Sequence, residues 1–404
     1  MEKTLGKNSR DAWGPEAFQA AEPSREQLGR AAAELRERLD WTEGGFAGLT
    51  EEQENGALLF LLEYARRSGD DWCGAMAEAV LERRGRTGSP LRAYACLEAY
   101  AQSGRPGRRT DACAVLDGAL REKRLPGGGF AETGEVSLVW NAQMIAALAK
   151  AYRVLGESAY LRAAEEARLF LKAQLTQSGG RLWQHWREGT PSGEGQLEDY
   201  GFYCWALAEL YGADLSVSCL REASALADRM TEIFRDPQGG LYDFESGDAG
   251  RSIAGLALSR VGRLTGLERH WDAAREQLAW LAGTEIPENL ALLGLTEELW
   301  PCRTLVCTCA GAPPAFLALV GEEYRMMALA KTRDNNRSLE NAAPWLRMFP
   351  VPESGTRLYL CRDGLCEAAA DDLFQLYQRL PSERTAEAAP AGMDVPADGT
   401  LLPQ

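Results

Sequence analysis

The chain has 404 residues, of which 44 are basic and 59 acidic, so its formal net charge at pH 7 is −15. This balance disfavours nucleic acid and anionic membrane surfaces as partners, because both attract clustered Lys and Arg. Hydrophobic residues make up 45% of the chain, enough for a large core. No stretch approaches the roughly 20 consecutive apolar residues that span a membrane.

Glycines recur along the chain in two alternating series. In the first series, a single glycine follows an Ala/Leu-rich run, as expected of a residue that ends a helix in the left-handed conformation. The second series consists of Gly-Gly pairs, and the alternation predicts helical hairpins with one short turn and one longer, glycine-rich turn. The single glycines are Gly69, Gly104, Gly156, Gly212 and Gly266, and the pairs begin at Gly44, Gly128, Gly179 and Gly239.

Apolar residues at i, i+3, i+4 and i+7 predict twelve helices. In chain order they are expected at about 25–39, 50–67, 71–84, 90–103, 108–123, 136–155, 158–175, 197–211, 214–235, 250–265, 268–282 and 286–299. Twelve helices in six hairpins is the number found in an (α/α)6 toroid, where six inner helices are surrounded by six outer ones. We therefore predict an all-α toroid over residues 25–300, preceded by an N-terminal extension at 1–24.

The helices that end at the single glycines are apolar nearly all round, which is typical of buried helices, so we assign them to the inner ring. Each Gly-Gly turn precedes an inner helix, and these turns should gather at one mouth of the toroid. The N-termini of the inner helices point there too, with free N–H groups and the positive end of the helix dipole. We expect any pocket at this mouth.

After Trp300 the pattern changes from helical to mixed. Residues 303–309 and 356–361 read as strands, and helices are expected at about 314–331 and 369–380. The segment 301–380 is therefore predicted to be a small β-α-β-α appendage. The tail at 381–404 is rich in Pro, Ala and Asp with little to bury, and it is predicted to be disordered.

Two sets of residues open inner helices and should meet at the mouth. Trp140 and Asn141 open one helix, and Glu198, Asp199 and Tyr200 open another. Carboxylates beside aromatic rings suit sugars, because rings stack on apolar sugar faces and carboxylates bind hydroxyls or act as general acid and base. The alternative is structural: acidic residues at a helix start complement the dipole, and Trp fills the core.

Three further residues stand near the same mouth. His185 lies between Trp183 and Trp186 in the loop before the helix at 197–211, where it could shuttle protons or simply pack in a hairpin. Trp186 and Asp243 are candidate ligand-binding residues, although Asp243 could equally serve its turn. The second histidine, His270, falls on an outer helix and is expected to face solvent.

The ten cysteines include no CxxC pair, so thioredoxin-type redox catalysis has no motif here. Cys307 and Cys309 share one face of a predicted strand, and Cys361 and Cys366 are spaced CxxxxC. Four thiolates could hold zinc, but the spacing does not demand it, and a buried thiol cluster is the preferred interpretation. We predict neither a metal nor a cofactor.

Long segments resemble a known family. The runs VWNAQMIAALAKAY, LEDYGFYCWALAELY and IFRDPQGGLYDF resemble the toroid of the spermatogenesis-associated, thioredoxin-domain-containing proteins, and RTLVCTC and TRLYLCRDGLC resemble that family's C-terminal strands. The resemblance covers about residues 40–380 and is most specific over 139–245. It implies a cytosolic protein whose toroid is similar to those of N-acylglucosamine 2-epimerases and six-hairpin glycosidases.

The chain also departs from this family. It is expected to lack the thioredoxin-like domain, the family's Asp-Asp-Lys reads Thr133, Gly134 and Glu135, and the family's Gly-Asn-Ser reads Gly250, Arg251 and Ser252. A His-Phe-Glu-Lys segment before the fourth helix is replaced by RGRTGSP. Epimerases of this shape use barrel histidines, and only His185 is placed for that role.

Two functions stay open at this point. The first is a cytoplasmic carbohydrate-binding or carbohydrate-active protein, with an epimerase, isomerase or glycosidase-like activity and a sugar ligand at the mouth. Its catalytic candidates are Glu198, Asp199 and His185, and its binding candidates are Trp140, Asn141, Tyr200, Trp186 and Asp243. The second is a non-catalytic scaffold or binding module that kept the fold.

Overall fold

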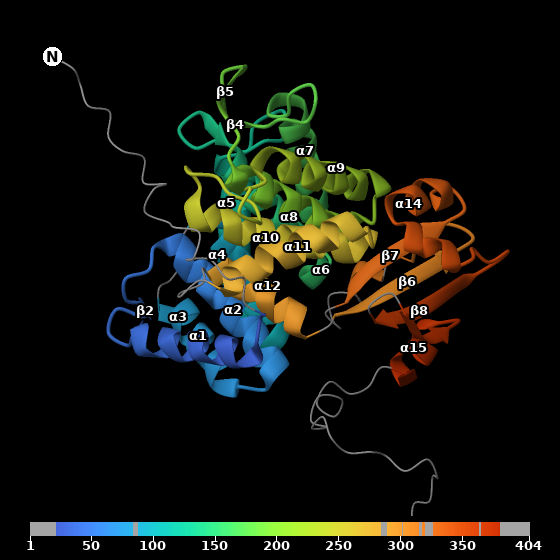
Figure 1. The fold of residues 1–404 in the computed structure, drawn as a ribbon, viewed down its shortest axis with the longest axis horizontal. Coiled ribbons are helices and arrows are strands. Elements are labelled where there is room, and N and C mark those ends of the chain that lie inside the picture. Colours follow the sequence, from blue (N-terminus) through green and yellow to red (C-terminus); the bar gives the residue numbers. More distant parts are fainter. Residues whose placement is uncertain are drawn as a thin grey trace, which may run out of the picture.

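The structure is a computed structural model that describes residues 22–83, 88–283, 289–300, 302–314, 317–319, 326–362 and 365–379. Most of the predicted N-terminal extension (1–24) and the whole predicted disordered tail (381–404) lie outside these residues. Helices dominate the described part, and a small sheet stands at one end (Figure 1). None of the described helices is both long and apolar enough to cross a membrane.

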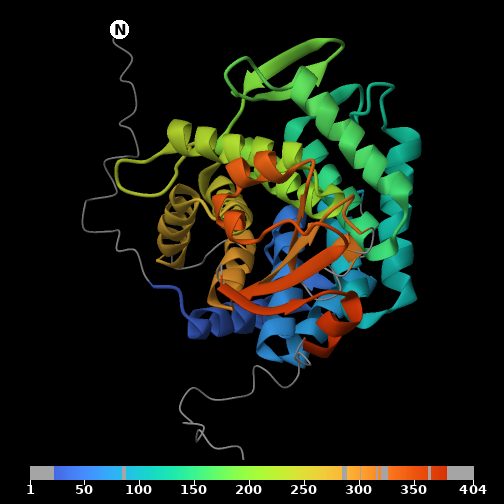
Figure 2. The ribbon, with the colours of Figure 1, turned by 90° about the vertical axis from the view of Figure 1, so that its right-hand side faces the viewer.

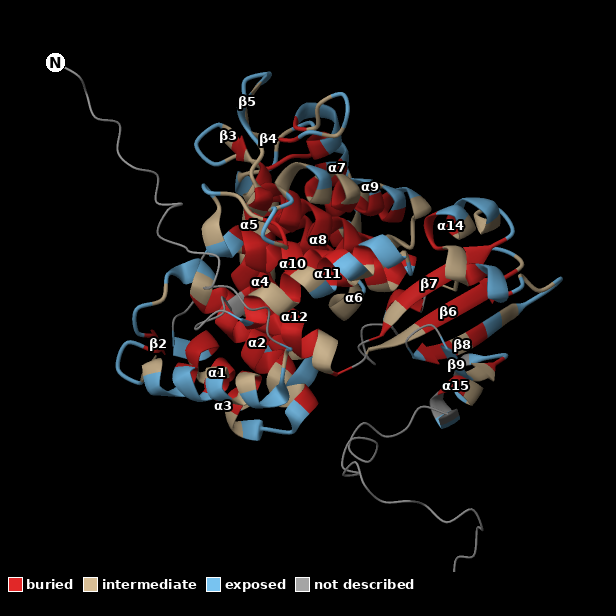
Figure 3. Ribbon diagram, viewed as in Figure 1, coloured by how far each residue is buried: buried red, intermediate tan, exposed pale blue. Residues whose placement is uncertain are grey.

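Six inner helices form a closed ring, because each packs on the next and the last packs on the first. The inner helices are α2 (Glu51–Ser68), α4 (Pro90–Ser103), α6 (Leu138–Leu155), α8 (Leu197–Asp214), α10 (Gly247–Thr265) and α12 (Asn289–Leu299). They are buried along most of their length, as expected of helices that are apolar nearly all round (Figure 3). The predicted (α/α)6 toroid is confirmed.

Each outer helix packs on an inner partner and carries one exposed stripe. The outer helices are α1 (Arg25–Arg38), α3 (Asp71–Arg83), α5 (Pro106–Glu122), α7 (Ser158–Gln174), α9 (Val217–Phe234) and α11 (Glu268–Ala282). The predicted division into an inner and an outer set is therefore correct for the described residues.

Four of the five single glycines end inner helices in the left-handed conformation, as predicted: Gly69, Gly104, Gly156 and Gly266. Gly212 does not. Helix α8 continues to Asp214, and Leu215 adopts the left-handed conformation in its place, with φ of 54°. The sequence misled here because a glycine can also serve close packing, and Gly212 lies against the guanidinium of Arg153.

The Gly-Gly turns are small hairpins, each closed by antiparallel pairing across the glycines. The pairs are Leu39 with Phe46 in strands β1 (Leu39–Asp40) and β2 (Gly45–Phe46), and the isolated bridges Arg124 with Phe130, Thr176 with Leu182 and Arg235 with Leu241. At Gly128, with φ of 98°, a side chain would also meet the backbone of Glu166 at 2.8 Å.

A repeated hydrogen bond, here called the turn clamp, ties these hairpins to the inner helices. The apolar residue after the glycines is buried, and its backbone N–H donates to a side chain at the fourth position of the next inner helix. The clamps are Phe46 to Glu54 (3.2 Å), Phe130 to Asn141 (2.8 Å) and Leu182 to Tyr200 (3.0 Å). In α10 the fourth residue is Gly250, and Leu241 N–H instead donates to Gln277 of outer helix α11 at 2.6 Å.

At the opposite end, ion pairs link neighbouring inner helices in a chain that we call the basal ring. Every link joins two different helices and involves side chains that are at most 12% exposed. The links are Glu98 of α4 with Lys150 of α6, Arg153 of α6 with Glu209 of α8, Glu209 with Arg260 of α10, and Arg260 with Glu297 of α12. Burial favours a neutral Glu209, but Arg153 and Arg260 outweigh it and hold the Glu209 pKa at about 2.

A four-stranded sheet covers the end of the toroid that carries the basal ring (Figure 2). Its strands are β6 (Arg303–Cys309), β7 (Met327–Thr332), β8 (Thr356–Arg362) and β9 (Leu365–Ala370), in the order β7-β6-β8-β9. Strand β7 runs parallel to β6, and the other pairs are antiparallel. Helices α14 (Asn336–Ala342) and α15 (Leu373–Arg379) and a 3-10 turn, η2 (Pro344–Met348), complete this part.

The predicted β-α-β-α order is wrong in two places. Residues 327–332 form β7, although 327–331 were expected at the end of a helix at 314–331. Residues 365–370 form β9, so the last helix begins at Leu373 rather than near 369. Strand β7 is buried at five of its six positions, so it lacks the alternation that marks a half-exposed strand. An Ala-rich buried run of this length has no periodicity that separates strand from helix.

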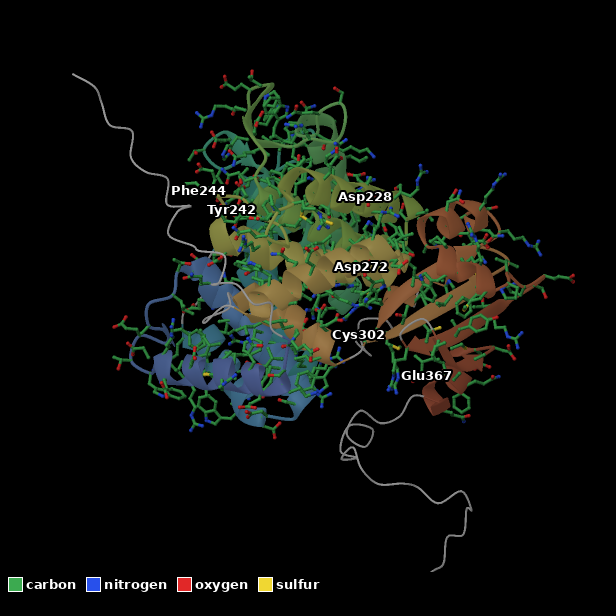
Figure 4. All side chains as sticks on the ribbon, viewed as in Figure 1. Asp228, Tyr242, Phe244, Asp272, Cys302 and Glu367 are labelled. Carbon is green, nitrogen blue, oxygen red and sulfur yellow. The ribbon has the colours of Figure 1, made fainter. Side chains whose placement is uncertain are left out.

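We expect Glu209→Gln to lower the free energy of unfolding by about 3–5 kcal/mol, because it removes the carboxylate that the buried guanidinium groups of Arg153 and Arg260 share and leaves Arg260 with Glu297. The measurement is urea unfolding followed by circular dichroism. Asp272→Asn on outer helix α11 is the control, since its pair with Arg275 is about two-thirds exposed (Figure 4). Equal effects of the two substitutions would contradict a structural role for the basal ring.

Candidate functional site

A hollow of about 450 Å³ opens at the mouth, between the N-termini of α2, α4 and α6. Its lining includes the ring of Trp140, the carboxylates of Glu51 and Glu52 in the first turn of α2, the amide of Gln143 and the hydroxyl of Ser89. The residues that line it are Glu51, Glu52, Gly88, Ser89, Pro90, Leu91, Glu132, Ser137, Val139, Trp140 and Gln143. We call it the mouth hollow.

Trp140 forms one wall of the mouth hollow. Its ring is half-buried, tilted against Phe130 at 5.9 Å between centroids, and covered by the ammonium of Lys123 at 4.7 Å. Glu52 stands nearby and accepts a hydrogen bond of 3.1 Å from the amide of Gln143. Neither Glu52 nor Gln143 was among the predicted site residues.

Glu198, at the second position of α8, is half-buried, and among the described residues its carboxyl has no hydrogen-bonding or cationic partner. Burial raises the pKa of Glu198 to about 7, with further contributions from the charges of Glu52 and Asp199. Glu198 therefore holds its proton near neutral pH beside a second carboxylate. This combination is typical of a general acid.

Asp199 is adjacent in sequence but differs in role. Its carboxylate accepts hydrogen bonds from the backbone of Gln196 (2.9 Å) and from Gln184 (3.4 Å), and it forms a capping box at the start of α8. Burial raises the pKa of Asp199 to about 6, although these bonds favour the charged form. The side chain is 4% exposed and is used to hold the helix start.

Asn141 and Tyr200 are turn clamps. Besides accepting from Phe130, the Asn141 amide donates to the carbonyls of Phe130 and Ser137, both at 2.8 Å, and the residue is fully buried. The Tyr200 hydroxyl holds Leu182, and its ring packs edge-on against Phe234 at 5.3 Å. We leave both out of the proposed ligand site.

Of the predicted site residues only Trp140 lines the mouth hollow, and the remaining candidates lie around α8 outside it. Asp243 accepts from the backbone of Leu197 at 3.0 Å and so caps α8, and Trp186 donates to Gln174 at 3.2 Å on outer helix α7. His185 lies on β4 (Trp183–Arg187), between β3 (Glu135–Ser137) and β5 (Thr190–Glu194). It is partly exposed, with Nδ1 3.3 Å from a Glu135 carboxylate oxygen.

The expectation that His270 faces solvent is wrong. The residue is 1% exposed, with Nε2 3.0 Å from Asp228 and Nδ1 3.1 Å from the Thr265 hydroxyl. It lies in the first turn of α11, where the chain leaves α10, and therefore faces inward. Burial lowers the pKa of His270 despite the neighbouring Asp228.

A second cavity, of about 140 Å³, lies between the basal ring and the sheet. Cys302 borders it, between the toroid and the sheet (Figure 4), and accepts hydrogen bonds from Arg67 (2.9 Å) and Arg263 (3.2 Å). The other cations lining the cavity are paired with Glu63 or with basal-ring carboxylates. Because the cations of this cavity are already paired with carboxylates, it is less suited to a ligand than the mouth hollow.

The four C-terminal cysteines that could have formed a zinc site lie on opposite faces of the sheet. Cys307 and Cys309 pack in the cluster around Leu305 and Leu358, whereas Cys361 belongs to the core shared with the toroid. No group of three or more His, Cys, Asp or Glu residues in the described part of the chain is arranged to hold a metal.

Comparison with known proteins gives a partial sequence match. No family model matches the chain. Over 123 residues, 28% of this chain, it is 32% identical to spermatogenesis-associated protein 20 of Mus musculus. The aligned segment spans 16% of that relative, well under two thirds of its length. The resemblance seen in the sequence is confirmed at this partial level.

Solved structures extend the likeness to the whole toroid. An inactive variant of the α-1,6-mannanase of Salegentibacter sp. HEL1_6, with two consecutive aspartates replaced by alanine and α-1,6-mannotetrose bound, superposes with a TM-score of 0.56. It covers 67% of this chain and 97% of the mannanase at 16% identity. A family 76 glycoside hydrolase of Bacteroides thetaiotaomicron gives 0.55, covering 68% and 97% at 11% identity. The fold is that of the six-hairpin glycosidases.

Replacing Asn141 with Ala should lower the free energy of unfolding by about 1–3 kcal/mol, because backbone groups of Phe130 and Ser137 lose their buried partner. Chemical denaturation measures this loss. Gln143→Ala, on the same helix, is the control and should cost less, since within the described part of the chain Gln143 bonds only to the exposed Glu52. A stable Asn141→Ala protein would contradict the clamp.

The Glu198 carboxyl should titrate at about pH 7, and Glu52→Gln should lower that midpoint by removing a neighbouring negative charge. Carboxyl ¹³C NMR measures the midpoint, with Glu51→Gln as the control that leaves it unchanged. Because the folded pKa exceeds the ordinary 4.5, stability should fall as pH rises from about 4.5 to about 7. A Glu198→Gln protein should lose the part of this dependence that lies above about pH 6, while Asp199, whose pKa is raised to about 6, keeps the part below it. An ordinary midpoint for Glu198 in the wild type would disprove the assignment.

Proposed function

We propose that the protein binds a carbohydrate in the mouth hollow and acts on its glycosidic linkage. The observation that carries this proposal is Glu198, a half-buried carboxyl with no cationic partner among the described residues, whose pKa stands at about 7 beside Glu52. Structural ion-pair networks hold carboxylates in the charged form, as the basal ring does at Glu209. Glu198 has the opposite environment, which suits proton donation.

The proposed chemistry assigns one role to each carboxyl group. Glu198 donates its proton to the departing glycosidic oxygen, and Glu52, from the facing helix α2, serves as the second carboxylate. The amide of Gln143 orients Glu52 through its 3.1 Å hydrogen bond. Trp140 offers a half-exposed ring, on which an apolar sugar face stacks in place of the Lys123 ammonium.

The named relatives support this proposal by analogy of fold. A mannanase of the same fold binds a mannotetrose and is inactive in a variant that lacks two consecutive aspartates. This chain has consecutive acidic pairs at the starts of α2 and α8, Glu51-Glu52 and Glu198-Asp199. The second residue of the α8 pair caps its helix, so we assign the chemistry to Glu52 and Glu198.

A non-catalytic sugar-binding module is the second candidate. The observation that favours it is the filled centre of the toroid, where Tyr94 and Trp205 are buried with ring centroids 5.1 Å apart. A binding module would keep the mouth hollow and the stacking at Trp140 without turnover at Glu198.

The test is a glycan panel that includes α-1,6-mannotetraose, with binding followed by saturation-transfer NMR and hydrolysis by product analysis. Trp140→Ala should weaken binding at least about tenfold, or about 1.4 kcal/mol, while Trp140→Phe retains most of it. Trp271→Phe on outer helix α11 is the control for loss of a tryptophan. Glu198→Gln should lower turnover by about 10²–10⁴ without loss of binding.

The outcomes separate the two candidates. Binding that depends on Trp140, with no turnover in the wild type, supports the module and rules out the enzyme. Turnover that survives Glu198→Gln would contradict the assigned proton donor. Binding that is insensitive to Trp140, or absent across the panel, would overturn the proposed site.

A further inference from the structure

Two cysteines face each other across the last hairpin of the sheet. Cys361 of β8 and Cys366 of β9 are direct partners in the antiparallel register, next to an irregularity between Leu360 and Cys361. Directly opposed residues of antiparallel strands have Cα atoms about 4.5–5.5 Å apart. This separation lies within the range of about 4.4–6.8 Å that a disulfide requires.

The two thiols differ sharply in access to solvent. Cys361 is fully buried, and burial raises its pKa to about 12, with the neighbouring Cys366 thiol as the next contribution. Cys366 is exposed on β9, the edge strand of the sheet, beside the 74% exposed Leu365. The Cys366 sulfur can therefore react with a reagent in solution, and Cys361 lies opposite it on the neighbouring strand.

Other cysteines in the described part of the chain do not show this arrangement. Cys307 and Cys309 are both buried on the same strand, and Cys302 is hydrogen-bonded by two guanidinium groups away from the hairpin. The pair at Cys361 and Cys366 combines direct opposition with one exposed member. These two properties are what thiol–disulfide exchange needs in order to end in an intramolecular bond.

We propose that Cys361 and Cys366 are a modification site, which a small disulfide such as glutathione disulfide converts into a reversible cross-strand disulfide. The Cys366 thiolate attacks one sulfur of glutathione disulfide, forming a mixed disulfide and releasing one glutathione thiolate. The Cys361 thiolate then attacks the Cys366 sulfur and displaces the second glutathione. Two cysteine thiols lose two electrons and two protons, and glutathione disulfide is reduced to two glutathione molecules.

The bond would pin the edge strand β9 to its neighbour at the point where the register is irregular. Helix α15 packs against both strands of this hairpin, so the end of the sheet would be held as a unit. Only four residues separate the two cysteines, and such a short loop gains little from cross-linking. The bond is therefore readily reduced by excess thiol, which makes the modification reversible.

The experiment exposes the native full chain to glutathione disulfide, quenches it with acid, alkylates free thiols and measures intact mass. The wild type should lose two alkylatable thiols without retaining glutathione, and reductant should restore both. Trypsin cuts after Arg362, between the two cysteines, so a non-reduced digest should contain their two peptides joined. Cys361→Ser should instead trap glutathione on Cys366, and Cys366→Ser should leave Cys361 unmodified.

Cys302→Ser is the matched control and should behave as the wild type does. A wild type that keeps glutathione on Cys366, or whose thiol count does not change, would overturn the proposal. So would a bond that joins either cysteine to a different partner. Circular dichroism of each variant before treatment ensures that the native fold is compared.

Discussion

The basal ring is the interaction on which the rest of the molecule depends. Each inner helix from α4 to α12 is tied to the next by a buried carboxylate–cation contact, so the helices cannot slide along their axes independently. Burying these charges is costly, and the network tolerates it because each charge lies against an opposite one. Fixing the helices at one end also fixes where their N-termini stand at the other.

The polar groups at the two ends of the toroid thus have different roles. At the base, carboxylates are held charged by cations. At the mouth, the fourth residues of α2, α6 and α8 hold the turns, whereas Glu52, the second residue of α2, lines the mouth hollow, and Glu198, the second residue of α8, keeps its proton near neutral pH. A ligand site is possible there because the side chains at the fourth helical positions hold the turns, and the proposed chemistry is assigned to other residues, Glu52 and Glu198.

Much of this architecture could be predicted from the sequence, because capping glycines and apolar periodicity are local signals. The basal ring also has a local signal in the sequence: in four inner helices, one ring charge stands six positions before the left-handed residue that ends the helix. The pairs are Glu98 and Gly104, Lys150 and Gly156, Glu209 and Leu215, and Arg260 and Gly266. Glu52 could have been found in the same way, since it occupies in α2 the position of Glu198 in α8.

Other features depend on contacts that no local pattern encodes. Asn141 and Tyr200 look like ligand-binding residues by type and place, and only the tertiary hydrogen bonds to Phe130 and Leu182 show that the fold uses them. His270 is polar on an outer helix, yet Asp228 and Thr265 provide it with a buried site. Strand β7 takes its structure from pairing with β6, against the preference of its Ala-rich sequence.

The turn clamp at α10 differs from the others, because Gly250 has no side chain that could accept the hydrogen bond. The replacement partner connects the inner and outer rings of helices. Since α10 has no side chain at that position, the hairpin before it is anchored by Gln277, which belongs to the outer helix α11. The same glutamine also donates to the carbonyl of Arg251 in α10, at 3.2 Å. Gln277 of the outer helix α11 thereby fixes the position of the loop that carries Tyr242 and Phe244 at the rim (Figure 4). A displacement of α11 would reshape the rim there while leaving the walls contributed by α2 and α6 in place.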